Sequence, residues 1–134
     1  YKKDGLHFLL LDAQQLPFSD NAVAFVVSSL SLHHWTDSAM AISEIYRVLR
    51  PGGQFLLFDV RRNAPRLFYW GLKLGQALLA PAAIRRTNGA VGSFWASYTP
   101  SELKATLSAI PLEELKVECG FGWVLAWGRK ALQP

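Results

Sequence analysis

Two short groups of residues in the first third of the chain have the chemistry to contact a ligand. Asp12 and Ala13 directly follow one apolar run, and Ser28, Ser29 and Leu30 end the next. The Asp12 carboxylate only accepts hydrogen bonds, so it suits a ligand that carries a donor, or it caps the turn after a strand. The serine hydroxyls can contact a ligand or close the strand, and both interpretations stay open.

A pair of histidines, His33 and His34, follows the second group. A neutral imidazole can take a proton from a hydroxyl near neutral pH, which makes either residue a candidate general base. A histidine at the start of a helix can equally be a packing residue, and this interpretation stays open too. Adjacent side chains on a helix point about 100° apart and no third ligand is evident, so we predict no metal site.

Three apolar runs should carry these residues to one edge of a sheet. Residues 7–11, which Asp12 ends, and residues 22–32, which run out near Ser28, indicate buried strands. A third run covers residues 54–60. Continuous apolar runs imply burial on both faces, so we expect a parallel sheet between layers of helices. In such sheets, ligands bind beyond the carboxyl ends of the strands.

The sequence between the second and third runs predicts a helix. Asp37 can cap it, and apolar residues recur at helical spacing from Ala39 to Leu49. The Pro-Gly-Gly of residues 51–53 should stop this helix. A strand, a helix and a strand in this order agree with parallel pairing.

The second half of the chain predicts two more helices and a closing hairpin. Residues 66–86 follow a helical pattern but are unusually apolar. Thr99 and Glu102 form a capping box for a further helix. Two strand candidates, residues 113–119 and 123–129, are joined by a short link containing glycine, which indicates an antiparallel hairpin.

The composition indicates one packed domain. Of its 134 residues, 51% are hydrophobic and 18% are charged. The net charge of +4 includes arginines at both ends of an apolar aromatic stretch but no long basic run, so we do not expect nucleic-acid binding. The single cysteine, Cys119, excludes an internal disulfide. We expect it to be at least half-buried in a strand, in a reducing, cytoplasmic setting, and we see no secretion leader.

Five pieces of the sequence stand in a specific order. They are Leu11-Asp12-Ala13, Leu16-Pro17-Phe18, Val26-Val27-Ser28-Ser29-Leu30 with Leu32-His33-His34, Val48-Leu49-Arg50-Pro51-Gly52-Gly53, and Tyr98-Thr99-Pro100 with Glu102-Leu103. Together with the closing hairpin they resemble the second half of the class I S-adenosylmethionine-dependent methyltransferase domain, above all its small-molecule and quinone-biosynthesis subgroup. The resemblance implies an α/β fold with a Rossmann-like sheet, in which residues 1–134 run from the third family strand to the C-terminal hairpin.

The resemblance also implies roles for individual residues. Asp12 matches the acidic residue that accepts a hydrogen bond from the adenine amino group of S-adenosylmethionine, and the backbone N–H of Ala13 matches the group that binds the adenine ring. Ser28, Ser29 and Leu30 match the strand end whose backbone meets the methionine part of the cofactor.

On the substrate side, the resemblance places His33 and His34 toward the pocket. Methyl transfer chiefly needs the acceptor to be aligned and water excluded. We expect residues 66–98, here termed the acceptor cover, to bind a small apolar or aromatic acceptor, with Trp95 and Tyr98 facing it. The flanking arginines could meet an anionic group or, less favoured, a membrane surface. A core helix or a subunit interface is the alternative, and the stretch is a poor candidate for spanning a membrane.

The chain departs from the family pattern at its N-terminal side. The family places a Gly-x-Gly loop after its first strand and an acidic ribose ligand after its second, and no residue before Leu6 matches either. We therefore expect weak or absent cofactor binding, and no activity, from this chain alone. The missing strands leave three alternatives: a longer natural protein, direct pairing of residues 6–11 with residues 22–27, or self-association in which a second chain fills the gap.

Two classes of function follow from these observations. The chain is a methyltransferase, or a fragment of one, that transfers a methyl group from S-adenosylmethionine to a small acceptor. The alternative is a non-catalytic, truncated α/β module that acts through oligomerisation or protein interaction.

Overall fold

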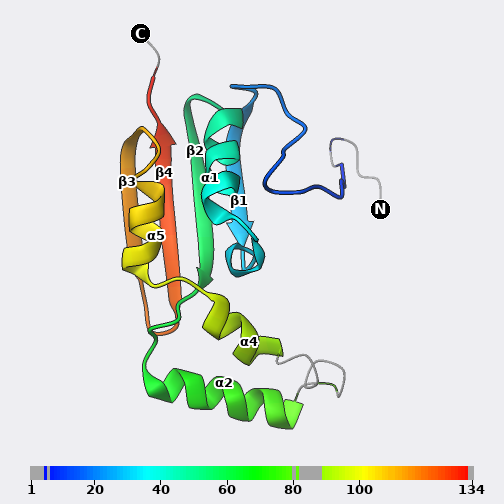
Figure 1. Ribbon diagram of the computed structural model, residues 1–134, viewed down its shortest axis with the longest axis vertical. Coiled ribbons are helices and arrows are strands. Elements are labelled where there is room, and N and C mark those ends of the chain that lie inside the picture. The colour runs from blue at the N-terminus through cyan, green and yellow to red at the C-terminus, as the bar shows by residue number, and fades with distance from the viewer. Residues whose placement is uncertain (1–4, 6, 80, 82–88, 133–134) are drawn as a thin grey trace.

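The computed structural model describes residues 5, 7–79, 81 and 89–132 of the chain. The elements, in order, are β1 (Val23–Ser29), the 3-10 helix η1 (Leu32–His34), α1 (Ser38–Val48), β2 (Leu49–Val60), α2 (Arg66–Leu79), α4 (Gly89–Ala96), α5 (Pro100–Leu107), β3 (Leu112–Cys119) and β4 (Trp123–Lys130). The strands lie in the order β1-β2-β4-β3 (Figure 1). β1 pairs with β2 in parallel, and β4 pairs with both β2 and β3 in antiparallel register. The predicted parallel pair and C-terminal hairpin are confirmed.

The helices of the body begin at the predicted caps. The Asp37 carboxylate accepts a hydrogen bond from Met40 N at 2.9 Å, which satisfies a free N–H of the first turn of α1. The Thr99 hydroxyl accepts from Glu102 N while the Glu102 carboxylate accepts from Thr99 N, so the capping box of α5 is complete. α1 ends at Val48, before the predicted Pro-Gly-Gly stop, because residues 49–60 already form β2.

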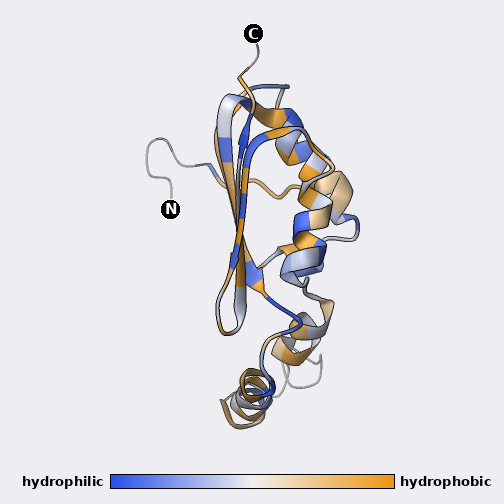
Figure 2. Cartoon of the chain, turned by 90° about the vertical axis from the view of Figure 1, so that its left-hand side faces the viewer, coloured by the Kyte–Doolittle hydropathy of each residue, from blue (hydrophilic) through white to orange (hydrophobic). Residues whose placement is uncertain are grey.

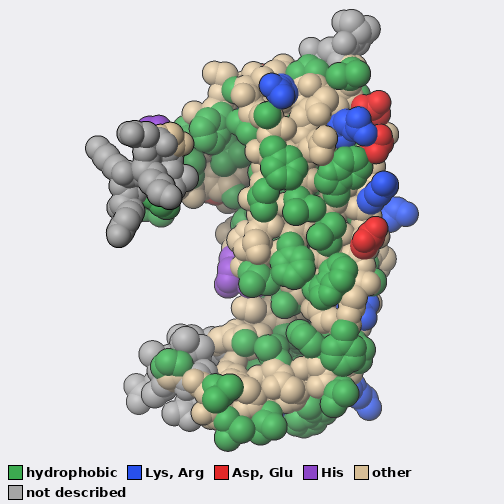
Figure 3. Space-filling view, turned by 180° about the vertical axis from the view of Figure 1, so that it is seen from behind, with side chains coloured by type: hydrophobic (Ala, Val, Ile, Leu, Met, Phe, Trp, Pro, Cys, Tyr) green, Lys and Arg blue, Asp and Glu red, His purple; other side chains and the backbone are tan. Residues whose placement is uncertain are grey.

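The core lies between the sheet and two helices, α1 and α5, which cover the same face (Figure 2). Its buried side chains are Leu32, Ile42, Ile45, Leu49, Phe55, Leu57, Leu103, Leu107, Val124 and Ala126. The expectation of helices on both faces is wrong for the described residues. On β1, Phe25 and Val27 alternate with core-facing residues and are 50% and 58% exposed. Figure 3 views this second face and shows hydrophobic side chains spread across it.

The apolar run of residues 7–11 is not a strand, and this prediction is wrong as well. Phe8 is 76% exposed and Leu10 is fully exposed, and the run is extended without regular pairing. β1 has β2 as its one neighbour among the described strands, so direct pairing of the run with residues 22–27 does not occur. An apolar run is buried only where a neighbouring strand and a covering layer exist, and here the described chain provides neither. Leu6 lies outside the described residues.

The described part of the acceptor cover forms two helices, α2 and α4, beyond the carboxyl ends of β1 and β2 (Figure 1). α2 confirms the predicted helix as far as Leu79; Pro81 is not helical, and residues 80 and 82–86 of the prediction lie outside the described residues. α4 packs on α2, and the ring centroids of Tyr69 and Phe94 lie 5.6 Å apart. Within α2 itself no side chain is buried. In the described ranges, none of the helices has both the length and the apolarity required to cross a membrane.

Candidate functional site

The parallel strands β1 and β2 end side by side, and the chain leaves β1 through a strained residue. Ser29 is in register with Phe58, and Leu30 N donates to Phe58 O at 2.8 Å. Leu30 has φ +52°, a left-handed conformation that is costly for a bulky side chain and is found most often near functional sites. Ser28 Oγ lies 2.6 Å from Ser31 Oγ, so this hydroxyl closes the turn after the strand.

Asp12 forms a tight turn with the two glutamines that follow it. Gln14 N donates to Asp12 Oδ1 at 2.9 Å, and Gln15 N donates to Asp12 O at 3.1 Å. The turn-capping interpretation of Asp12 therefore describes a real contact. The side chain is exposed, and among the described residues Oδ2 has no hydrogen-bond donor, so this oxygen can still accept a bond from a ligand.

Two neighbouring hollows bring the Asp12 turn and the end of β1 together. One, of about 420 Å³, lies between the turn and the segment after η1, and Asp12, Ala13, His34 and Trp35 line it. The other, of about 330 Å³, is lined by Ala13 and Trp35 again and by Ser28 and Ser29. Four of the residues expected from the resemblance to bind the cofactor, Asp12, Ala13, Ser28 and Ser29, thus line two adjoining hollows at the carboxyl end of β1, here termed the rim, whereas Leu30 lines neither hollow.

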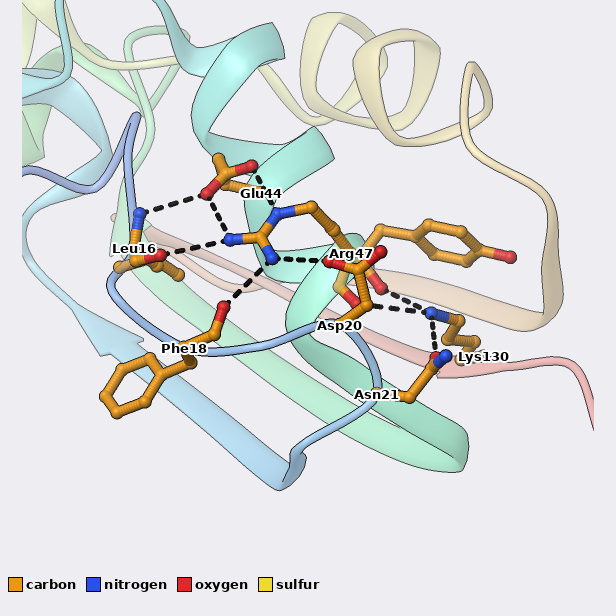
Figure 4. A network of polar contacts seen from close by, with 8 residues as sticks. Leu16, Phe18, Asp20, Asn21, Glu44, Arg47 and Lys130 are labelled. Carbon is orange, nitrogen blue, oxygen red and sulfur yellow. Dashed lines mark hydrogen bonds and ion pairs between the residues drawn. The ribbon is translucent and has the colours of Figure 1, made fainter.

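A clamp formed by Arg47 holds the chain between this turn and β1 against α1 (Figure 4). The Arg47 guanidinium donates to Leu16 O at 3.0 Å and to Phe18 O at 2.9 Å, and it pairs with Asp20 at 2.6 Å. Glu44 accepts from Leu16 N at 3.0 Å and from Arg47 Nε at 2.7 Å. The bonds from Arg47, and next the bond from Leu16 N, lower the pKa of the Glu44 carboxyl to about 2, so the clamp is ionised at neutral pH.

The end of the same segment is tied to β4 (Figure 4). Lys130 Nζ donates to Asn21 Oδ1 and to Tyr46 O, both at 2.8 Å, and lies 4.4 Å from the centroid of the Tyr46 ring. Burial lowers the pKa of this ammonium group. Asn21 adopts φ +59°, which asparagine tolerates better than most residues, and the chain turns there into β1.

His33 is held by a carboxylate at the end of β2. Its Nδ1 lies 2.8 Å from Asp59 Oδ1, and its backbone N–H donates to Asp59 Oδ2 at 3.1 Å. Both side chains are buried, with 4% of His33 and 2% of Asp59 exposed. Sequence reasoning missed Asp59; the available signal was a lone acidic residue within the apolar run 54–60.

His34 is exposed and lines the hollow next to Asp12. Its ring centroid lies 4.0 Å from that of His33, so the two rings contact each other rather than diverging. Both histidines stand on the short 3-10 helix η1.

Trp95 and Tyr98 lie apart from the Asp12 rim and from each other. Trp95, on α4, is 58% exposed and lines a hollow between α2 and α4. The Tyr98 hydroxyl bonds to Ser38 Oγ at the start of α1, and its side chain borders another hollow beside Glu102. α4 also contacts η1, so the helix that carries Trp95 adjoins the one that carries the histidines. Cys119, expected to be at least half-buried, is exposed at the end of β3.

Comparison with known proteins agrees with this arrangement. Residues 1–57 match the profile of a family described as a methyltransferase domain. Over 56 residues the chain is 41% identical to the ubiquinone/menaquinone biosynthesis C-methyltransferase UbiE of Blochmanniella floridana; the match covers 42% of this chain and 22% of that protein. Over 91 residues it is 32% identical to the phthiotriol/phenolphthiotriol dimycocerosates methyltransferase of Mycobacterium tuberculosis, covering 68% of this chain and 33% of the relative. The chain thus spans a minor part of the length of these curated relatives.

A solved structure shows the same fold. A SAM-dependent methyltransferase from Thermotoga maritima superposes with a TM-score of 0.61 at 20% identity, over 88% of this chain and 61% of the other. At this identity the likeness concerns the fold alone. The matching family profile over residues 1–57 and the quinone-biosynthesis relatives, together with the Rossmann-like arrangement of strands, support a relationship to the class I S-adenosylmethionine-dependent methyltransferase family.

Proposed function

We propose that this chain supplies part of the active site of an enzyme that transfers a methyl group from S-adenosylmethionine to a small apolar or aromatic acceptor. The observation that carries the proposal is the common rim formed by the Asp12 turn and the end of β1. When bound, the cofactor would supply an activated methyl group on a sulfonium, whose sulfur would keep the electron pair of the carbon–sulfur bond when the methyl group leaves for the acceptor. The non-catalytic alternative is not favoured by the family relationship.

The residues of the rim fit the adenosine end of this cofactor. Asp12 Oδ2 can accept from the adenine amino group, and the half-buried Ala13 and Trp35 offer an apolar wall for a flat ring. The chain turns away from β1 at the exposed residues Ser29 and Leu30, and the methionine end of the cofactor would lie at this turn. We propose Asp12, Ala13, Ser28, Ser29 and Leu30 as the cofactor-binding residues of this chain.

His33 and Asp59 form the proposed base for an acceptor that must lose a proton. A hydrogen on His33 Nδ1 donates to the Asp59 carboxylate at 2.8 Å, which leaves the Nε2 lone pair to accept a proton. The acceptor proton thus passes to His33 as the new bond to carbon forms. His34 lines the hollow beside Asp12, the side proposed here for the adenosine end of the cofactor, and is not among the lining residues of the hollow within the acceptor cover.

We further propose that residues 1–134 form a single partial domain and that the acceptor cover closes over the acceptor. Self-association is part of the proposal, because β1 has one neighbour among the described strands and exposes Phe25 and Val27. A reducing, cytoplasmic setting is consistent with the single, unpaired Cys119.

The test is a nuclear magnetic resonance titration of the chain with S-adenosylhomocysteine, which detects weak binding. We expect shifts of the amide signals of Ala13, Ser29 and Leu30. Asp12→Asn should abolish these shifts, whereas Glu118→Gln, an exposed carboxylate on β3, should leave them unchanged. Shifts confined to other residues would contradict the proposed site. Calorimetry should find weak binding at most, and sub-micromolar affinity would contradict the expectation that the missing glycine loop supplies much of the contact.

A further inference from the structure

The hollow between α2 and α4, within the acceptor cover, has a different chemistry from the two hollows on the Asp12 side. It has a volume of about 380 Å³, within the range of small-molecule pockets. Aromatic rings and two arginines line it: Arg62, Arg66, Tyr69, Trp70, Phe94 and Trp95. Of these, Phe94 is 3% exposed and forms the floor, whereas both tryptophans are 58% exposed and form the walls.

The rings support one another and are fixed to the sheet. The Tyr69 centroid lies 5.6 Å from Trp70, 5.6 Å from Phe94 and 5.7 Å from Trp95. Phe68 anchors α2 by packing on the turn of the hairpin between β3 and β4. Only glycine fits at position 122 of this turn, because a side chain there would collide with the Phe68 ring. The hollow is therefore lined by aromatic rings that contact one another, which suits a planar apolar group.

The charges around this hollow favour an anion. Arg62 pairs with the Glu102 carboxylate, so much of its charge is offset. Arg66 has no ion-pair partner among the described residues. Lys73 lies 5.0 Å from the centroid of the Trp70 ring and adds a further positive charge. No acidic side chain belongs to the lining residues. A guanidinium at the mouth of an apolar pocket binds a carboxylate with two parallel hydrogen bonds.

We infer that this hollow binds the methyl acceptor, and that the acceptor carries a carboxylate on a flat apolar ring. That the ligand is the methyl acceptor rests on the proposed function. The ring stacks among Tyr69, Trp70 and Trp95, while Arg66 holds the carboxylate. α4 forms part of this hollow and also contacts η1, the helix that carries His33 and His34, although neither histidine lines the hollow.

The experiment titrates the chain with 2-naphthoate and, separately, with the uncharged 2-naphthamide, without any cofactor. The indole N–H signals of Trp70 and Trp95 report binding. We expect 2-naphthoate to shift both signals and to bind about tenfold more tightly than the amide, as expected for one charge-assisted hydrogen-bonded pair. Arg66→Gln should remove this difference. Arg50→Gln, at an exposed arginine on β2, should preserve it.

Three results would overturn the inference. Equal affinity for the acid and the amide would deny the role of charge, and unchanged binding in Arg66→Gln would deny the role of that residue. A third result would assign this face to a membrane surface instead. In that case 2-naphthoate would cause no shifts, the chain would bind anionic phosphatidylglycerol vesicles, and Leu74→Asp would abolish the binding to vesicles. The titration with 2-naphthoate contains no cofactor, so its outcome is independent of cofactor binding. If 2-naphthoate fails to bind while S-adenosylhomocysteine still shifts the amide signals of Ala13 and Ser29, the proposed function stands.

Discussion

Both sides of this molecule carry large apolar side chains, but the two sides differ in how far these are buried. On the packed side, formed by β2, β4, β3, α1 and α5, Leu57 is 1% exposed and Val124 is completely buried. On the open side, formed by residues 7–11, the outer edge of β1 and α2, Leu10 is fully exposed and Leu79 is 85% exposed. The comparison shows that an apolar stretch of sequence can be buried, but that it is buried only where neighbouring helices or strands cover it. The proposed site lies at the junction of the two sides.

The largest effect that tests this comparison is on the core. Leu57→Ala should lower the free energy of unfolding by about 2–5 kcal/mol, because it removes a buried side chain and leaves a cavity. Leu10→Ala, the matched change on the open side, should cost less than about 0.5 kcal/mol. Urea unfolding of the two variants measures both values. Similar losses would mean that residues 7–11 pack in solution and that the distinction is wrong.

A smaller effect is expected at the junction. Asp59→Asn should lower the free energy of unfolding by about 1–3 kcal/mol, because a buried acceptor for two His33 donors is weakened. The imidazole nitrogen shifts of His33 should also lose their preference for a proton on Nδ1, while those of the exposed His34 change little. If the His33 tautomer were indifferent to this substitution, Asp59 would not position the base.

The smallest effect concerns the clamp that ties the open side to the packed side. The depressed pKa of Glu44 means that its contacts are fully present above the ordinary value of 4.5 and are lost as the pH falls through about 2. The side-chain carboxyl signal of Glu44 should therefore titrate near pH 2, and Arg47→Met should move the midpoint up toward 4.5. Amide exchange at Leu16 should become faster in that variant. If Arg47→Met left the titration midpoint of Glu44 unchanged, the contact between Arg47 and Glu44 would not exist in solution.

Local signals in the sequence predicted most of the packed side. The helix caps at Asp37 and Thr99 depend only on residues a few positions away in the sequence. The glycine-containing link at residues 120–122 likewise specifies a hairpin without contacts to distant parts of the chain. β1 and β2 were predicted as strands for the same reason, since β-branched and aromatic residues suit a sheet wherever it lies.

The remaining features depend on contacts between distant parts of the chain. Burial of residues 7–11 required a strand beside them, and the described residues contain none there. The bond between His33 and Asp59 joins two ends of neighbouring strands, and Arg47 reaches back to carbonyl groups at Leu16 and Phe18. No periodicity or cap encodes such pairs. The resemblance placed Asp12 and Ser28 near one rim, but it supplied neither the clamp nor the base that would serve it.

The central claim, that the Asp12 turn and the end of β1 form one rim, can be measured directly. A nitroxide attached at Ala13→Cys, in a chain where Cys119 is replaced by serine, should broaden the amide signals of Ser28, Ser29 and Leu30. It should spare those of Leu112 and Glu113 on the far edge of the sheet, because β3 and β1 are separated by β2 and β4. Sharp signals at Ser28–Leu30 together with broadening at Leu112 would contradict the account.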